Sequence, residues 1–297
     1  MKRRLLTMLM AAVMAGTALT GCGSDGEIDK AIVETEDEEE AVEEQEAEVE
    51  EVTIEEAVLL DESGIKITTT GMEDGWMGTE LKLLIENNSD TDVTVQARNS
   101  SVNGFMVETM LSENVATGKK ANTTLTFSTS GLKEANITTI TDMEFAFHIF
   151  DSETWDEYLD SEMIVVETSA AGSYEQSVDD SGTVFYDADG VKIIGKGLST
   201  DDSIFGPGLI VFIENDSDRN ITVQVRDTSV NGFMIDTSMS QDVMAGKKAY
   251  TAATFFDSSL EENGIEEITQ VETSFHIFDM DSWDTISDTD PIVVDFE

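Results

Sequence analysis

The 297-residue sequence predicts an all-β protein that contains two tandem β-sandwich domains. Three observations lead to this prediction: a long block of residues occurs twice, apolar and polar residues alternate in both copies, and turn-forming residues separate the alternating runs. Hydrophobic residues make up 40% of the chain, which is enough to build packed cores. No stretch resembles a βαβ unit, which argues against the two-lobed α/β fold of solute-binding proteins.

The first element is a targeting segment. Basic residues 2–4 precede an apolar run at 5–18, and Leu-Thr-Gly-Cys follows at 19–22. A basic start, a short apolar run and a small residue before a cleavage point are typical of a secretory signal, and this run is too short to span a membrane comfortably. The tetrapeptide resembles the bacterial lipobox, which directs lipid transfer to its Cys. We therefore expect residues 1–21 to be a lipoprotein signal peptide and Cys22 to carry a lipid on the outer face of the cell membrane.

Residues 22–56 form the second element, an acidic tether. Between residues 23 and 56 there are 17 acidic residues and one basic residue, a composition that cannot bury enough apolar surface to fold. We expect a disordered spacer of at most about 110–120 Å, or alternatively a weak binder of cations. The formal net charge of −47 excludes nucleic acid as a partner, because binding to phosphates needs Lys and Arg.

The rest of the chain repeats itself at a spacing of 128 residues. From position 84 to 166 the two copies align without a gap, and 43 of 83 positions are identical. A period of this length corresponds to a whole domain. We therefore expect one domain at 57–168, a linker at 169–181 and a second domain at 182–297. The motifs that occur in both copies are Ile-Glu-Asn-x-Ser-Asp (85–90, 213–218), Ser-Val-Asn-Gly-Phe-Met (101–106, 229–234), Gly-Lys-Lys-Ala (118–121, 246–249) and Phe-His-Ile-Phe-Asp (147–151, 275–279).

Within each copy, apolar residues alternate with period two, as in strands with one buried face. The first copy shows this at 81–85, 93–97, 121–127 and 143–149. The Asn-Gly pairs at 103–104 and 231–232 predict type I′ hairpins, because both central residues of that turn need positive φ. One helical turn is expected at 132–137 and at 260–265, and also around each of the two later tryptophans. Short strands with turns at this spacing predict a β-sandwich.

The repeated motifs also resemble the telokin-like, immunoglobulin-like domains of lipoproteins from Gram-positive, clostridial-type bacteria. The resemblance covers residues 57–297 together with the lipobox. It implies two tandem immunoglobulin-like sandwiches on the outer face of the membrane. Most proteins of this kind have no assigned function, so the resemblance implies fold and location only.

Catalytic signals are weak. His148 and His276 occupy the same position in the two copies, on the strand face opposite the large apolar residues, where we expect hydrogen-bonded surface histidines. No nucleophile elbow, phosphate-binding loop or zinc-type spacing accompanies them. We therefore expect no enzyme. Arg98 with Glu144, and the matching pair in the second copy, are expected to form cross-strand ion pairs, with a clamp for a ligand carboxylate as the alternative.

Tryptophans are the main candidates for contact with a ligand or partner. Trp155 and Trp283 fall in loops after equivalent strands, where an aromatic ring either anchors a partner or caps the core. Trp76 lies beside the one small insertion between the copies and has no Trp counterpart.

An acidic cluster in the second of these loops is a candidate cation site. Asp279, Asp281 and Asp284 are expected to bind Ca²⁺ if their oxygens converge; otherwise no cofactor is expected. Apolar residues on the outer face, Leu84 and Phe212, are expected to pack within the chain, with contact to another protein as the alternative.

The sequence as a whole therefore predicts a non-catalytic binding module, anchored to the membrane by its lipid and facing outward. We expect an extracellular protein as its partner. The alternative is a carbohydrate- or cell-wall-binding module that contains structural calcium.

Overall fold

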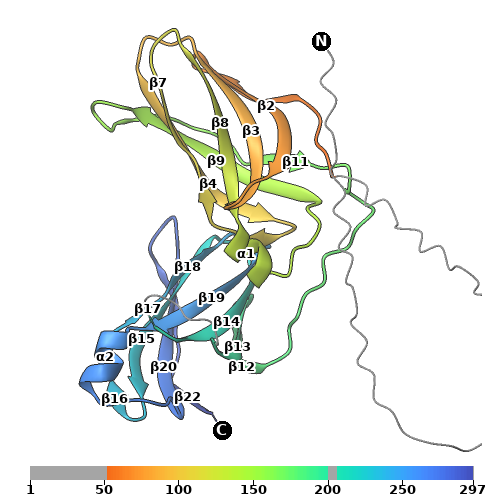
Figure 1. Cartoon of the computed structure of the whole chain (residues 1–297). Helices are drawn as coiled ribbons and strands as arrows, with labels where there is room; N and C mark the ends of the chain where they lie inside the picture. Colours follow the sequence, from red (N-terminus) through yellow and green to blue (C-terminus); the bar gives the residue numbers. More distant parts are fainter. Residues whose placement is uncertain (1–51, 200–205, 297) are drawn as a thin grey trace, which may run out of the picture. The chain divides into compact units, whose positions relative to one another are not determined.

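A computed structural model of the chain describes residues 52–199 and 206–296, which consist mostly of β-strands joined by turns (Figure 1). The described residues fall in a single compact unit of the chain. The strands and their sheets confirm the prediction of an all-β, sandwich-like fold. Cys22, the predicted signal peptide at 1–21 and residues 22–51 of the predicted tether lie outside the described residues. Below, residues 57–168 are called the first repeat and residues 182–297 the second repeat.

Within the described residues the two repeats contain matching series of elements. The elements of the first repeat are β1 (Ala57–Glu62), β2 (Ile65–Asp74), β3 (Gly78–Asn87), β4 (Val93–Val102), β5 (Phe105–Met106), β6 (Thr109–Met110), β7 (Ser112–Val115), β8 (Lys120–Ser128), α1 (Thr129–Glu134), β9 (Asp142–Asp151), β10 (Glu157–Asp160) and β11 (Ile164–Glu167). Those of the second repeat are β12 (Thr183–Ala188), β13 (Val191–Leu198), β14 (Gly208–Asn215), β15 (Ile221–Val230), β16 (Phe233–Met234), β17 (Thr237–Ser238), β18 (Ser240–Val243), β19 (Lys248–Phe255), α2 (Asp257–Glu262), β20 (Gln270–Asp279), β21 (Thr285–Asp288) and β22 (Ile292–Asp295).

Each repeat places two sheets face to face. In the first repeat, one sheet has the order β1-β2-β3-β8-β6 and the other contains β10-β9-β4-β5, with β7 paired to β4 and β11 paired to β9. In the second repeat, β12-β13-β14-β19 faces β16-β15-β20-β21. Helices α1 and α2 are single short turns that follow β8 and β19, so they begin three residues earlier than the sequence predicted. The Trp155 and Trp283 segments each contain one turn, closed by a hydrogen bond from the Trp N–H to the carbonyl four residues earlier, and neither turn continues into a helix.

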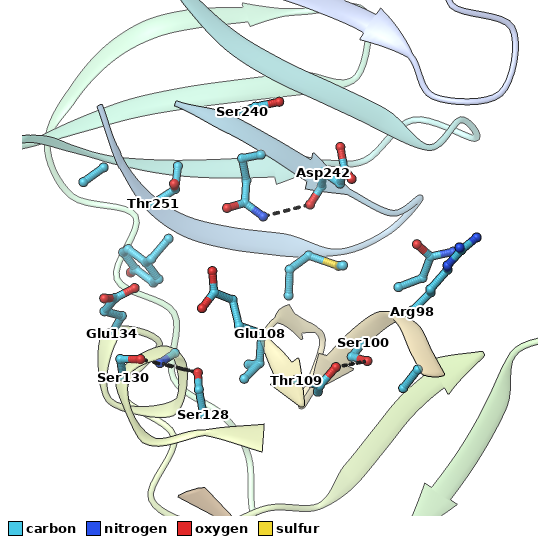
Figure 2. Close-up of a pocket in the computed structure, with 18 of the residues that line it drawn as sticks. Arg98, Ser100, Glu108, Thr109, Ser128, Ser130, Glu134, Ser240, Asp242 and Thr251 are labelled. Carbon is cyan, nitrogen blue, oxygen red and sulfur yellow. Dashed lines mark hydrogen bonds between the residues drawn. The ribbon is translucent and has the colours of Figure 1, made fainter. Parts of the chain in front are cut away.

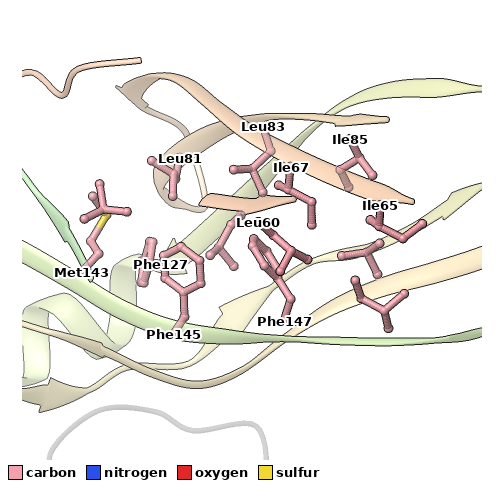
Figure 3. Packing of buried hydrophobic residues seen from close by; sticks show 14 of the residues in the cluster. Leu60, Ile65, Ile67, Leu81, Leu83, Ile85, Phe127, Met143, Phe145 and Phe147 are labelled. Carbon is pink, nitrogen blue, oxygen red and sulfur yellow. The ribbon is translucent and has the colours of Figure 1, made fainter. Parts of the chain in front are cut away.

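The core of the first repeat lies between its two sheets, as the alternation predicted (Figure 3). Leu81, Leu83 and Ile85 of β3 are at most 1% exposed, and they face Phe145 and Phe147 of β9 across the sandwich. A second, separate cluster contains the corresponding residues of the second repeat. The repeat of the sequence is therefore also a repeat of core packing.

The repeated Ile-Glu-Asn-x-Ser-Asp motif builds a buried turn around its Asn. Asn87 is fully buried, and its Nδ2 donates to the carbonyl oxygens of Thr91 and Val115, both at 2.8 Å. Its Oδ1 accepts hydrogen bonds from the backbone N and the Oγ of Ser89. Asn215 makes the same set of bonds in the second repeat. One amide thus ties the end of a core strand to the loop that follows it and to the end of β7, since buried carbonyls need partners.

The Asn-Gly hairpins form as predicted. Asn103 and Gly104 have φ of 50° and 81°, and Asn231 and Gly232 have φ of 50° and 82°, as a type I′ turn requires. Each hairpin connects a long strand to a two-residue strand, β4 to β5 and β15 to β16.

The hairpin of the first repeat also joins the two repeats. Strand β5 pairs in parallel with β19, so one continuous sheet runs from β10 through β5 and β19 to β12. Phe105 packs with Ile194 and Phe212 in a small third cluster, and Phe212 is fully buried there. This confirms, for Phe212, the expectation that outer-face apolar residues pack within the chain. Leu84, its counterpart in the first repeat, is half-buried.

The predicted linker is held against the second repeat. The backbone carbonyl of Asp179 accepts a hydrogen bond of 2.9 Å from the Tyr250 hydroxyl, and its carboxylate pairs with Lys196 at 2.9 Å. Hydrogen bonds from Ser181 and Lys196 lower the pKa of Asp179 to about 2. The carboxylate therefore stays ionised over nearly the whole acidic range.

Candidate functional site

The two tryptophan loops have the same backbone construction. After β9, the Oδ1 of Asp151 accepts the backbone N–H groups of Glu153 at 2.8 Å and Thr154 at 3.0 Å. The N–H of Trp155 then donates to the backbone carbonyl of Asp151 at 2.9 Å. These backbone hydrogen bonds lower the pKa of Asp151. One ionised carboxylate thus fixes the turn that presents the tryptophan.

The loop after β20 repeats this construction in the second repeat. Asp279 accepts the N–H groups of Asp281 and Ser282, both at 2.9 Å, and the N–H of Trp283 donates to the Asp279 carbonyl at 2.9 Å. The pKa of Asp279 is lowered, mainly by its hydrogen bond from the backbone of Ser282. The sequence of the turn changed between the copies, but its hydrogen bonds did not.

Each tryptophan ring stacks on a buried phenylalanine and remains in solvent. Trp155 lies on Phe150 with a centroid distance of 5.4 Å and an interplanar angle of 17°, and Trp283 lies on Phe278 at 5.5 Å and 17°. The tryptophans are 74% and 75% exposed. Core capping, which the sequence favoured over binding for these two tryptophans, is therefore wrong, because each ring covers one outer-face phenylalanine and leaves most of its own surface free.

The histidines extend these stacks along the sheet surface. His148 packs on Phe150 at 5.4 Å, and its Nδ1 lies 2.5 Å from Oδ1 of Asp160, its direct cross-strand neighbour. His276 packs on Phe278 at 5.2 Å and meets Asp288 at 2.6 Å. The expectation of hydrogen-bonded surface histidines is confirmed.

We name these rows of side chains the first ladder (Asp160, His148, Phe150, Trp155) and the second ladder (Asp288, His276, Phe278, Trp283). The sequence singled out the histidine and the tryptophan of each ladder, but it gave no indication that their rings stack on Phe150 and Phe278.

Both tryptophans adopt an unusual backbone conformation. Trp155 has φ of 65° and Trp283 has φ of 64°. For a bulky side chain such a φ is a genuine outlier and costs on the order of 1 kcal/mol or more. The same strained tryptophan thus occurs twice, in loops where Gly or Asn would be easier to accommodate.

Trp76 stands apart from the ladders. It lies in the turn between β2 and β3 and is 88% exposed, next to Met77, which is 39% exposed. The corresponding turn of the second repeat includes residues outside the described ranges. Trp76 is therefore a single exposed ring, whereas the other two tryptophans are held by stacking.

The acidic residues of the second ladder loop do not form a metal site. In residues 52–199 and 206–296, no group of three or more His, Cys, Asp and Glu side chains is placed to hold a metal ion, and this includes Asp279, Asp281 and Asp284. The carboxylate of Asp279 is instead engaged by two backbone N–H groups. The geometry thus gives no support to the calcium expectation.

The predicted ion pair between Arg98 and Glu144 is wrong. A bulge in β4, at residues 99–100, places Arg98 opposite Ala146 and Glu144 opposite Ser101. Glu144 instead pairs with Lys247 of the second repeat at 2.5 Å. In the second repeat Arg226 donates to its neighbour Gln224 at 3.3 Å. Glu144 therefore acts at the joint between the repeats.

A cavity of about 490 Å³ lies beside this joint, between β4, β6 and α1 on one side and β18 and β19 on the other (Figure 2). Its wall is polar, with Glu108 and Glu134 facing it from one side and Arg98 at its edge. Sequence reasoning missed this cavity, because its wall combines residues that are more than 100 positions apart and carry no shared motif.

No helix in the described part of the chain is long and apolar enough to cross a membrane. No family model matches the chain, and no curated protein matches it. Among solved structures, the crystal structure of the YadV chaperone aligns over 73% of this chain and 92% of its own, with 8% identity and a TM-score of 0.22. A similarity of this size supports no argument about fold or function.

Proposed function

We propose that the chain is a lipid-anchored extracytoplasmic lipoprotein, related to the telokin-like family that its motifs resemble, and that it works as a non-catalytic binding module. Cys22 would hold it to the membrane and the acidic tether would space it from the surface. The tryptophans at the ends of the two ladders would make the contact with a partner protein.

The single observation that carries this proposal is the repeated, strained and exposed tryptophan. An indole ring that is about three-quarters exposed and held at positive φ contributes little to the core. Stacking on Phe150 or Phe278 restricts the ring before any partner arrives. A restricted aromatic ring loses little conformational entropy on binding, which is why Trp is enriched among the residues that dominate interface energies.

Carbohydrate is the second candidate ligand, and a specific feature favours it. Each tryptophan has one face on a phenylalanine, which leaves the other face for a flat apolar surface such as that of a sugar ring. Exposed carboxylates lie close by in sequence, Glu153 and Asp156 in the first loop and Asp281 and Asp284 in the second. Carboxylates accept hydrogen bonds from sugar hydroxyl groups.

Crosslinking on intact source cells tests the proposal, with the anchored chain as bait and mass spectrometry of what it captures. We expect one reproducible protein, captured by the parent chain and lost in the double variant Trp155→Ala, Trp283→Ala. The variant Trp76→Ala is the matched control, since it removes an exposed ring that belongs to no ladder.

Three outcomes would overturn parts of the proposal. Capture that depends on Trp76 alone would move the site away from the ladders. Retention on purified cell wall, lost in the double variant and without protein capture, would establish carbohydrate as the ligand. Capture that survives all three substitutions would remove the tryptophans from the contact altogether.

A further inference from the structure

The two copies of the Ser-Val-Asn-Gly-Phe-Met hairpin are identical in sequence but differ in their contacts. The copy at 101–106 forms the joint between the repeats, whereas the copy at 229–234 ends at the open edge of its sheet. The first copy therefore shows what the hairpin binds, and the second shows a hairpin of the same sequence without that contact.

The joint contains three kinds of contact. The backbone N–H of Lys248 donates to the carbonyl of Gly104 at 3.0 Å, which pairs β5 with β19. Phe105 stacks on Tyr250 at 6.0 Å with an interplanar angle of 8°. Lys247 and Glu144 form the ion pair of 2.5 Å beside them. Burial at this joint leaves Phe105 only 1% exposed.

The hairpin of the second repeat offers the same groups to solvent. Phe233 is 49% exposed and Met234 is 65% exposed. Strand β16 is the edge of its sheet within the described part of the chain, so its outer backbone groups are free to pair. Glu272, the counterpart of Glu144, has no ion-pair partner among the described residues.

The first repeat carries the counterpart of the surface that receives the hairpin. Lys120 corresponds to Lys248, and each pairs with an equivalent glutamate of the neighbouring strand, Glu86 and Glu214. The Lys120 side chain is 62% exposed, whereas the hairpin and its surroundings reduce exposure at Lys248 to 23%. Lys119, the counterpart of Lys247, is exposed and has no ion-pair partner in residues 52–199 and 206–296.

We propose that the chain associates head to tail with itself. In this arrangement the 229–234 hairpin of one copy docks on β8 of the next, beside Lys120, and repeats the geometry of the joint. The backbone N–H of Lys120 would then donate to the Gly232 carbonyl, and Glu272 would pair with Lys119. Two observations favour a second copy over an unrelated partner. The docking repeats a contact that already forms the joint, and Glu272 and Lys119 carry opposite charges without an ion-pair partner among the described residues.

The receiving surface of the first repeat is less apolar than that of the second. Leu84 stands in place of Phe212, Asn122 in place of Tyr250, and Thr68 in place of Ile194. Less apolar area is therefore available to Phe233 than Phe105 finds at the joint. We expect the association to be reversible and concentration-dependent.

Photo-crosslinking with the purified full chain in phosphatidylcholine vesicles tests this proposal. A benzophenone amino acid replaces Phe233, and a matched control places it at Met163, a methionine that is 40% exposed between β10 and β11. We expect a crosslinked dimer from position 233, with the attachment mapped to residues 84 or 119–122, and at least fivefold less dimer from position 163.

Charge reversal tests the register of the docking. Glu272→Lys and Lys119→Glu are each expected to lower the yield of dimer from position 233 by about three- to fivefold, in line with an exposed ion pair. The double variant should restore the yield, because it rebuilds the pair with the charges exchanged. A merely structural effect of either substitution would not be rescued in this way.

Several results would overturn the proposal. No dimer from position 233 would exclude self-association through the hairpin. Attachment within one chain, to residues 23–51, would show that the acidic tether covers the hairpin instead. A dimer crosslinked elsewhere, or one insensitive to both charge reversals, would place the contact outside β8.

Discussion

Phe105→Ala and Phe233→Ala are expected to differ strongly in their effect on stability. The two residues sit in identical six-residue hairpins with the same turn dihedrals, so local propensity and hairpin strain cancel in the comparison. What remains is the packing of Phe105 against Tyr250, Phe212 and Ile194. The pair of variants therefore isolates the energy of the joint.

The size of the difference follows from the exposed fractions, 1% for Phe105 and 49% for Phe233. A phenylalanine buries about 150–250 Å² when it is fully enclosed. Roughly half of this, about 75–125 Å², is the extra burial at Phe105, which at ~25 cal/mol per Å² gives about 2–3 kcal/mol. A cavity left at the joint would add to this figure for Phe105→Ala.

Equilibrium urea unfolding of the full chain, followed by far-ultraviolet circular dichroism at low protein concentration, measures both variants. We expect Phe105→Ala to lower the free energy of unfolding by about 2–3 kcal/mol more than Phe233→Ala does. A splitting of the transition into two steps in Phe105→Ala alone would also fit, because the joint couples the repeats. Equal losses in the two variants would refute the reasoning.

Three further predictions concern the turns and the linker. Asn87→Ala should lower the free energy of unfolding by about 1–3 kcal/mol in urea, since it removes the side-chain donor to the buried Val115 carbonyl, whereas Asn88→Ala, at an exposed position, should change it little. Asp279→Ala should raise hydrogen exchange at the backbone amides of Asp281 and Ser282, which donate to the Asp279 carboxylate. Unchanged protection of these amides would show that the turn is stable without the carboxylate. Asp179→Asn should lower the urea midpoint at pH 7. The folded pKa of Asp179 is about 2, below the ordinary value of 3.8. Its contribution is therefore present above about pH 4 and lost as the pH falls through about 2, and a pH-independent difference between variant and parent would contradict this.

Much of the fold could be predicted from the sequence, because its signals are local. Alternation at 81–85 identified a strand with one buried face, and Leu81, Leu83 and Ile85 are indeed buried. Asn103-Gly104 identified its hairpin, since few other residue pairs accept positive φ at both positions. These inferences needed only neighbouring residues.

Predictions failed where the structure depends on contacts between residues that are far apart in the sequence. The ion pair between Arg98 and Glu144 was expected from simple alternation, but Asn99 adopts φ of 56° in a bulge and shifts the pairing beyond it. The joint could not be predicted, because the two hairpins have the same sequence and the residues that distinguish their surroundings, Ile194, Phe212 and Tyr250, lie on other strands. The stacking of Trp155 on Phe150 depends in the same way on tertiary geometry.

The continuous sheet through β5 and β19 has a consequence for avidity. The sheet joins the repeats, and the core of the second repeat connects that sheet to β20, which precedes Trp283, so the two tryptophans belong to one connected unit of the chain. A ligand with two sites at the matching spacing would engage both rings, and its second contact would form at a high effective concentration. A ligand with any other spacing would use one ring and bind with the affinity of a single contact, so under the proposed function the joint would determine which bivalent ligands bind with avidity.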